Sequence, residues 1–196
     1  MSTMRFVKGV AACAVLASAA GADAAMITFV HEGMGGGVVG NTVFGATAPV
    51  PFVITAVGDT DNLDTSLGFA RFINHDSAVI DIFGVGTFTF TSPTRTFVNV
   101  NGIVGFSRAG ASGLDLFNGP QTAELGAWDM LSSIGPVSGD GALSQWGALP
   151  IIETDAGVIE FFGASSPATF TAFVVPTPAG LALCGIGALV AARRRR

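Results

Sequence analysis

The 196-residue chain is poor in charge and has no tyrosine. Charged residues make up 12% of it, about half of the roughly 25% that is usual in globular proteins. Residues 25–175 contain three arginines, no lysine and thirteen carboxylates, which gives this stretch a formal charge of −10. A surface this acidic repels phosphate backbones, so we expect no nucleic-acid partner.

Cysteine is almost as scarce as tyrosine. The two cysteines, Cys13 and Cys184, fall in the two ends of the chain. The middle of the chain therefore has no disulfide, no thiol nucleophile and no thiolate metal site. About 150 residues remain there, which is a normal size for a domain with one hydrophobic core.

Residues 1–24 have the three parts of a secretory signal peptide. Arg5 and Lys8 form a basic region, and an apolar stretch follows that is too short to span a membrane. Ala22 and Ala24 then provide the small residues that signal peptidase requires, so we expect the signal helix to be removed after Ala24. The alternative is a buried N-terminal helix of the domain, but the apolar stretch lacks the polar face of a surface helix.

The other end of the chain is uncharged from residue 161 to residue 192, and four arginines follow, Arg193, Arg194, Arg195 and Arg196. Pro178 is favourable at the first position of a helix, and a helix from there to Ala192 would be about 21 Å long. Because a bilayer core is about 30 Å thick, this predicts a short transmembrane helix. The arginines should stay in the cytoplasm, which places the domain outside.

Residues 175–196 resemble the PEP-CTERM sorting signal, which combines a Pro-Glu-Pro motif, an apolar helix and an arginine-rich tail. Pro176, Thr177 and Pro178 occupy the motif, with threonine where the family usually has glutamate. The resemblance implies export in a Gram-negative bacterium that makes exopolysaccharide. It also implies recognition by an exosortase, a membrane transpeptidase that cleaves near the motif. The residues alone leave open an ordinary C-terminal membrane anchor.

The exported domain, residues 25–175, has the periodicity of β-strands. Apolar and polar side chains alternate in residues 86–91, and Asn101-Gly102 predicts a hairpin turn between residues 94–99 and 102–108. Further candidate strands cover residues 26–31, 50–57, 67–73, 78–83, 157–162 and 168–175. Their spacing predicts an all-β, antiparallel β-sandwich of jelly-roll or immunoglobulin-like type.

Residues 27–162 are also similar to a β-rich domain that recurs among PEP-CTERM proteins. The similar stretches are GTFTFTSPTRTFVN, VGFSRAG and AWDMLSSIGPVSG. The resemblance implies a β-rich fold and supplies no catalytic residues to carry over. One part of the domain, residues 121–134, could hold a helical turn or two.

Asp59, Asp61 and Asp64 form the best candidate for a metal site. Three carboxylates within six residues could wrap a Ca²⁺ ion, which takes roughly six to eight oxygen ligands. The spacing of an EF-hand loop is absent, and the alternative is an acidic turn between two strands. Apart from calcium, we expect no cofactor.

His31 and His75 each lie beside a carboxylate, but adjacent residues on a strand point to opposite faces and do not form a dyad. A zinc ion would need roughly three or four ligands, so we expect ordinary strand-end or turn histidines. Residues 35–40 match the GxGxxG pattern of dinucleotide-binding loops. No helical pattern follows them, which favours a loop or hairpin.

Three further groups could carry chemistry. Two carboxylates at the right separation could hydrolyse a glycoside, and the candidates are Asp81, Asp115, Asp129 and Glu153. Trp128 and Trp146 could stack on sugar rings if they are exposed, although tryptophans in so phenylalanine-rich a domain are more often core residues. Arg95 and Arg108 are expected to pair with carboxylates rather than with a ligand.

The sequence therefore favours an exported, non-enzymatic protein. We expect a single-pass inner-membrane form with a cytoplasmic C-terminus, processed by signal peptidase and an exosortase and then placed at the cell surface or in the exopolysaccharide matrix. The rival hypothesis is a secreted carbohydrate-binding module or glycan hydrolase. Exposed tryptophans beside two carboxylates would favour the rival, and buried tryptophans would favour the structural protein.

Overall fold

The computed structural model describes residues 25–110, 115–143, 151–162 and 164–175. These residues form strands and one short helix. In chain order the elements are β1 (Met26–Gly35), β2 (Gly37–Val39), β3 (Thr42–Phe44), β4 (Val50–Asp64), β5 (Ala70–Ile82), β6 (Gly86–Thr89), β7 (Thr94–Asn99), β8 (Ile103–Arg108), β9 (Asp115–Gln121), α1 (Ala123–Ala127), β10 (Ile134–Leu143), β11 (Glu153–Thr154), β12 (Gly157–Phe161) and β13 (Ala164–Val175).

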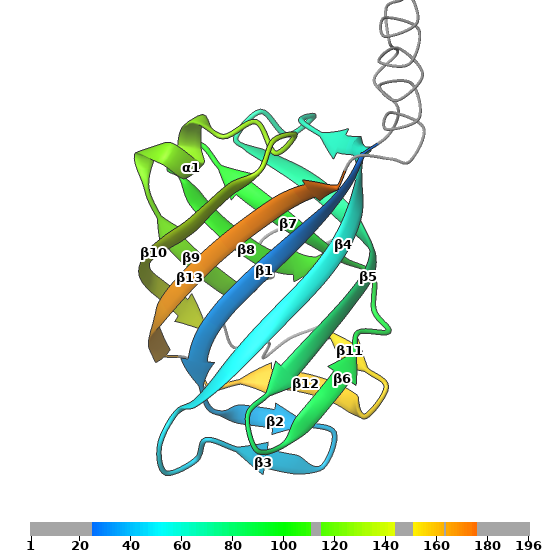
Figure 1. The fold of residues 1–196 in the computed structure, drawn as a ribbon. Coiled ribbons are helices and arrows are strands. Elements are labelled where there is room, and N and C mark those ends of the chain that lie inside the picture. The colour runs from blue at the N-terminus through cyan, green and yellow to red at the C-terminus, as the bar shows by residue number, and fades with distance from the viewer. Residues whose placement is uncertain (1–24, 111–114, 144–150, 163, 176–196) are drawn as a thin grey trace, which may run out of the picture.

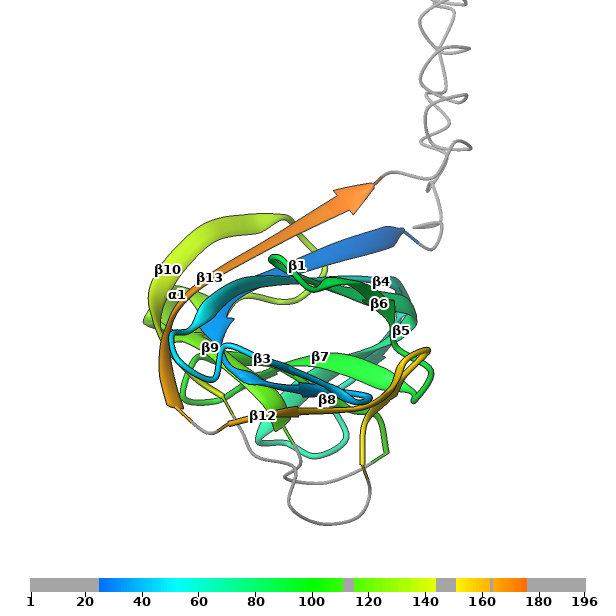
Figure 2. The ribbon, with the colours of Figure 1, turned by 90° about the horizontal axis from the view of Figure 1, so that it is seen from below.

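Eight of the strands close into an antiparallel barrel (Figure 1). Around the barrel the order is β1, β4, β5, β7, β8, β9, β10 and β13, and β13 pairs again with β1. Neighbours in this ring follow one another in the chain, apart from the short inserted elements, so the topology is up-and-down. Figure 2 shows the ring from below.

The prediction of a β-sandwich is wrong, because β4 and β5 pair with each other and leave the main sheet no free edge there. Gly58-Asp59 predicts a turn from sequence, yet β4 continues through it to Asp64 with shifts of register on both sides of Gly58. Such bulges bend a strand and increase its twist, as closure of a barrel requires. A Cβ on Gly58 would lie 2.8 Å from the carbonyl oxygen of Asn74, so only glycine allows this approach.

The alternation of side chains that the sequence predicts is present and fills the barrel. Inward residues of β1 and β4 are buried at every second position. Phenylalanine and isoleucine supply most of the core volume, and the largest fully buried side chains are Phe29, Phe52, Phe106, Phe117, Phe161, Phe170, Ile27, Ile54, Ile73, Ile80 and Ile82. An eight-stranded barrel is narrow enough for side chains to fill it in this way.

The two ends of the barrel are closed differently. At the lower end β11, β12, β2 and β3 form a separate sheet, and Phe161 of β12 packs on Phe52 with ring centroids 4.7 Å apart. At the upper end Trp128, directly after α1, packs on Phe29 and Phe170 of the barrel. The upper end is also where the described chain begins and ends (Figure 1).

Three local predictions are confirmed. β7 and β8 pair as a hairpin whose turn contains Asn101 and Gly102. Residues 35–40 end β1, form β2 and begin the turn into β3, so the glycine-rich segment belongs to a hairpin. The single described helix, α1, lies within residues 121–134, and the Thr122 side chain caps it by accepting from the backbone N–H of Leu125.

Among the residues that the structure describes, no helix is long and apolar enough to cross a membrane. The helices predicted within residues 1–24 and 176–196 lie outside the described residues.

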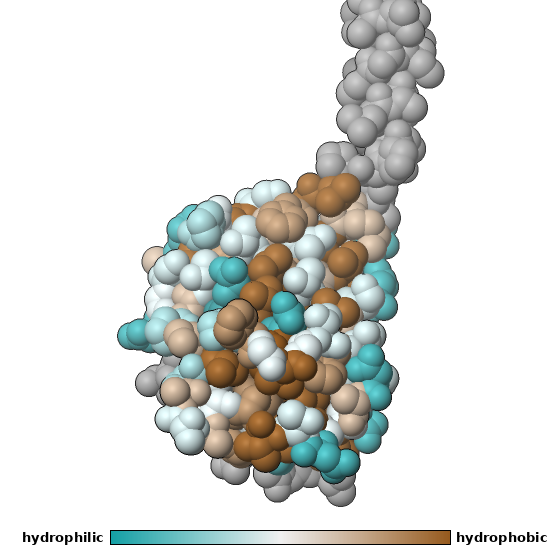
Figure 3. Space-filling model, turned by 60° about the horizontal axis from the view of Figure 1, so that its bottom comes forward, coloured by the Kyte–Doolittle hydropathy of each residue, from teal (hydrophilic) through white to brown (hydrophobic). Residues whose placement is uncertain are grey.

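Exposed apolar side chains gather at the two ends of the barrel. Among the described residues, the large exposed side chains at the upper end, where the described chain begins and ends, are Leu67, Phe69, Val100, Leu131, Phe173 and Val175. Those at the lower end are Met34, Val43, Phe83 and Phe162. Figure 3 shows hydrophobic residues at the base of the grey tail and others over the middle and lower part of this face, among hydrophilic ones.

The turn of the β7–β8 hairpin gives a prediction about stability. Gly102 has a φ of +74°, and a Cβ there would collide with the carbonyl oxygen of Thr122. We expect Gly102→Ala to lower the free energy of unfolding by at least about 2 kcal/mol, measured by urea unfolding of the full chain. Gly84→Ala is the matched control, because Gly84 has a φ of +75° with nothing within 4 Å. Equal losses in the two variants would contradict the close contact.

Candidate functional site

A chain of four hydrogen-bonded polar side chains crosses the barrel interior. Oγ1 of Thr96 lies 3.1 Å from Nε2 of His31 and 2.9 Å from Nε2 of His75. Nδ1 of His75 lies 2.9 Å from Oγ1 of Thr94. Strands β1, β5 and β7 contribute these residues, so barrel closure brings together two histidines whose meeting the sequence does not predict.

Aromatic rings surround the two histidines. His31 is fully buried against the rings of Phe106, Phe117 and Phe170, and His75 stacks on Phe106 at 5.3 Å. Burial lowers the pKa of both histidines to about 3, and the neighbouring His31 adds to the effect on His75. Both imidazoles are therefore neutral at pH 7.

The hydrogen bonds restrict the tautomers. Thr96 has one hydroxyl proton, so it can donate to only one of the two Nε2 atoms. Nδ1 of His31 has no hydrogen-bond partner among the described residues. A buried lone pair without a partner is less unfavourable than a buried N–H without one, so we assign the proton of His31 to Nε2. The chain then runs from His31 through Thr96 to His75, and Nδ1–H of His75 donates to Thr94.

A small polar cavity of about 270 Å³ opens beside His75 in the barrel wall. It lies where β5 stops pairing with β7 and begins to pair with β6. Asp76, Ser92 and Thr94 are among the residues that line it. Since Nδ1 and Nε2 of His75 both have threonine partners, this histidine has no free nitrogen to offer a metal ion.

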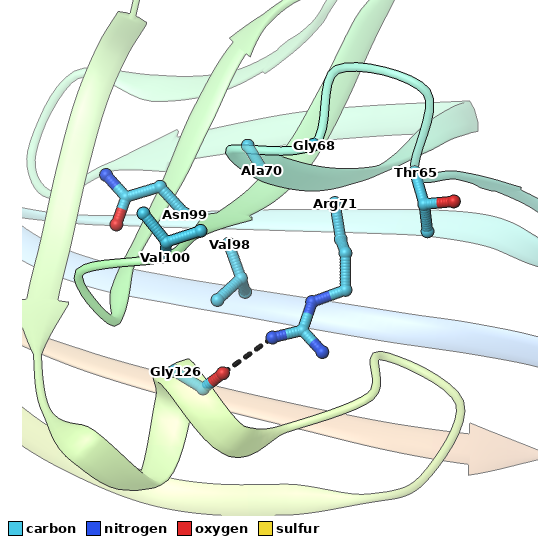
Figure 4. A pocket seen from close by; sticks show the side chains of 8 residues that line it. All are labelled: Thr65, Gly68, Ala70, Arg71, Val98, Asn99, Val100 and Gly126. Carbon is cyan, nitrogen blue, oxygen red and sulfur yellow. Dashed lines mark hydrogen bonds between the residues drawn. The ribbon is translucent and has the colours of Figure 1, made fainter.

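A larger cavity, of about 340 Å³, lies at the upper end of the barrel (Figure 4). Arg71 extends into it from β5, and its Nη2 donates to the carbonyl oxygen of Gly126 in α1 over 2.6 Å. We call this cavity the mouth pocket, and its lining residues are Thr65, Gly68, Ala70, Arg71, Val98, Asn99, Val100 and Gly126. No motif in the sequence marks Arg71, although it shares the alternation that turns Ile73 inward on β5.

Two of the three carboxylates of the calcium hypothesis, Asp59 and Asp64, accept local hydrogen bonds. Asp59 accepts from the backbone N–H of Asp61, and Asp64 accepts from that of Ser66. The hydrogen bond from Ser66 lowers the pKa of Asp64. Among the described residues no group of three or more histidine, cysteine, aspartate or glutamate side chains could hold a metal ion. Calcium binding here stays a prediction.

Trp128 is a core residue. It is 5% exposed, and its Nε1 donates to the carbonyl oxygen of Ser132 over 2.8 Å. A sugar ring therefore cannot stack on Trp128 without displacing the barrel core. Trp146 lies outside the described residues.

The four carboxylates that could form a glycosidase pair lie on or beside four different elements of the fold. Asp81 accepts from Thr87, and Asp129 accepts from Leu131 and Ser132, which lowers the pKa of Asp129. Burial raises the pKa of Asp115, partly offset by a hydrogen bond with Asn118 and the charge of Arg95. Glu153 is exposed on β11.

Arg95 lies on the outer wall of the barrel. Its guanidinium carbon is 4.1 Å from the ring centroid of Phe72, and its Nε donates to Oγ of Ser107. Burial lowers the pKa of Arg95, and the charges of Asp115 and Asp64 act in the opposite direction. Pairing of Arg95 with a carboxylate stays a prediction. Arg108 lies opposite Thr94 in the β7–β8 hairpin and is half-buried.

Comparison with known proteins gives no relative for this fold and these sites. The chain matches no family model, no curated protein and no solved structure. Its function therefore has to be inferred from its own residues.

Proposed function

We propose that this chain is an exported, non-enzymatic protein of the cell surface or exopolysaccharide matrix, held at a membrane by its C-terminal segment until it is sorted. The pairing of β1 with β13 supports this proposal, because it places Met26 opposite Val175. The predicted signal cleavage site and the predicted sorting segment are therefore attached to the same end of the barrel. A barrel attached in this way keeps its wall and its lower end accessible.

The hydrogen-bond partners of the described titratable groups support a non-enzymatic role. His31, in the core, and His75, which is half-buried, both bond to threonines, and Asp59, Asp64 and Asp129 bond to nearby backbone N–H groups. General acid–base catalysis needs such groups within hydrogen-bond reach of a substrate. Here they stabilise the barrel and its loops instead.

Two enzymes would act on the chain under this proposal. Signal peptidase would cleave after Ala24, and an exosortase would recognise residues 176–178 together with the arginines at 193–196. The four arginines would oppose transfer of the segment across the membrane.

Removal of the C-terminal segment tests this proposal. We expect deletion of residues 176–196 to leave the barrel folded and to move the protein from the membrane fraction to the medium, because β13 already ends at Val175. Cell fractionation with immunoblotting measures the location, and circular dichroism of the released protein measures the fold. Replacement of Arg193–Arg196 by serine should weaken membrane retention without changing the fold. A truncated protein that misfolds, or that stays in the membrane fraction, contradicts the proposal.

A further inference from the structure

The mouth pocket contains a cation whose charge no side chain of the described residues balances. Gly126 is the one hydrogen-bond partner that the described residues provide for Arg71, and no carboxylate among them lies within ion-pair distance. A guanidinium has five N–H donors, so most of those on Arg71 remain available. An arginine without a carboxylate partner among the described residues is unusual in a domain that contains thirteen carboxylates and three arginines.

The surroundings of Arg95, in the same domain, differ from those of Arg71. Arg95 covers a phenylalanine ring, bonds to Ser107 and lies near two carboxylates. Arg71 is also half-buried, but the described residues that line its cavity include no aromatic ring and no carboxylate. A charge that is removed from water is normally paired, and a bound anion would give Arg71 a partner that the described residues do not supply.

The size and lining of the mouth pocket restrict the ligand. A volume of about 340 Å³ is at the lower end of the range for small-molecule sites, and holds a molecule of monosaccharide size. Thr65 and Asn99 add polar groups to the lining, while Val98 and Val100 add an apolar surface. A hydroxylated ring with one charged group has both kinds of surface.

The charge of the ligand follows from the number of cations. Among the described residues that line the pocket, Arg71 is the one basic residue, and the domain around it is strongly acidic. A phosphate dianion or a polyanion would be repelled by the domain, whereas a carboxylate carries one charge and matches the planar fork of a guanidinium. We propose that the mouth pocket binds a small hydroxylated carboxylic acid, of the size and chemistry of a sugar acid, through Arg71.

Isothermal titration calorimetry of the full chain in detergent micelles tests this proposal, with galacturonate as the probe. We expect saturable binding with a dissociation constant of about 1 mM or tighter, and much weaker binding of the neutral sugar galactose. Inorganic phosphate should bind more weakly than galacturonate. The assay does not depend on export, so its failure and that of the proposed function are distinguishable.

Three variants locate the site. Arg71→Gln should weaken binding of galacturonate at least about tenfold, and Arg71→Lys should also weaken it, because lysine keeps the charge but not the paired N–H donors. Val100→Trp keeps Arg71 and should block the pocket, since Val100 is 67% exposed at its edge. Arg108→Gln is the control and should bind like the original chain. Circular dichroism checks the fold of each variant. If Arg71→Gln does not fold, Arg71→Lys and Val100→Trp still test the site.

Absence of galacturonate binding to the unaltered chain would overturn the proposal. So would equal binding of galactose, tighter binding of phosphate, or unchanged binding in Arg71→Gln and Val100→Trp.

Discussion

Acidification from pH 7 to pH 4.5 is expected to destabilise the barrel strongly, because His31 and His75 are neutral in the fold. Burial lowers the pKa of each to about 3, whereas an exposed histidine has a pKa of 6.5. Between these two values the unfolded chain binds protons that the folded chain does not. Stability is therefore complete above pH 6.5 and is lost as the pH falls towards 3. Each histidine contributes up to about 1.4 kcal/mol for each pH unit in this range.

Urea unfolding of the full chain at several pH values between 4.5 and 7.5 measures this effect. The range avoids most of the titration of Asp64 and Asp129, whose lowered pKa values place their titration at more acidic pH. The raised pKa of Asp115 acts in the opposite direction, since its protonation favours the fold as the pH falls. A double variant, His31→Leu with His75→Leu, should have a nearly flat profile. A flat profile in the original chain, or the same slope in both proteins, would contradict the buried neutral pair.

Phe170→Ala is expected to give the largest loss of stability from a single substitution in the core. Phe170 is fully buried on β13, with ring centroids 4.9 Å from His31, 5.6 Å from Trp128 and 6.5 Å from Phe29. Its removal would leave a cavity where the barrel wall meets Trp128 at the upper end. We expect the free energy of unfolding to fall by about 3–5 kcal/mol.

Phe83→Ala is the matched control for that substitution, because Phe83 is 73% exposed in the turn after β5. It should change the free energy of unfolding by less than about 0.5 kcal/mol. Urea unfolding at pH 7.5 measures both variants. A loss at Phe170 as small as that at Phe83 would show that the barrel interior is not packed as described.

The strands of the barrel could be predicted from sequence, but their arrangement could not. Alternation of apolar and polar residues shows which side of a strand is buried, and this pattern is the same in a sandwich and in a filled barrel. Whether the strands form a sandwich or a barrel depends on whether β4 pairs with β5. Two segments with turn-like composition made that pairing unpredictable from sequence. Gly58-Asp59 and residues 74–77 lie inside β4 and β5, at or beside shifts of register, and do not end the strands.

The candidate sites show the same limit. His31 and His75 could be named from sequence, but their shared partner, Thr96, lies on a third strand, which pairs with the strand of His75 and meets His31 in the closed barrel. Arg71 is one of three arginines in the domain, and no neighbouring residue in the sequence marks it. Its proposed role depends on the cavity and on the lack of a counter-charge among the described residues, both of which are properties of the folded chain.

The chain ends of the native protein test the central claim, that this barrel is exported and attached by one end, most directly. Mass spectrometry of the terminal peptides, combined with cell fractionation, measures both processing and location. We expect a mature protein that begins at Ala25 and is found in the membrane, at the cell surface or in the matrix. A protein that keeps residues 9–20 in exported material, or that is found intact from Met1 in the cytoplasm, would contradict it.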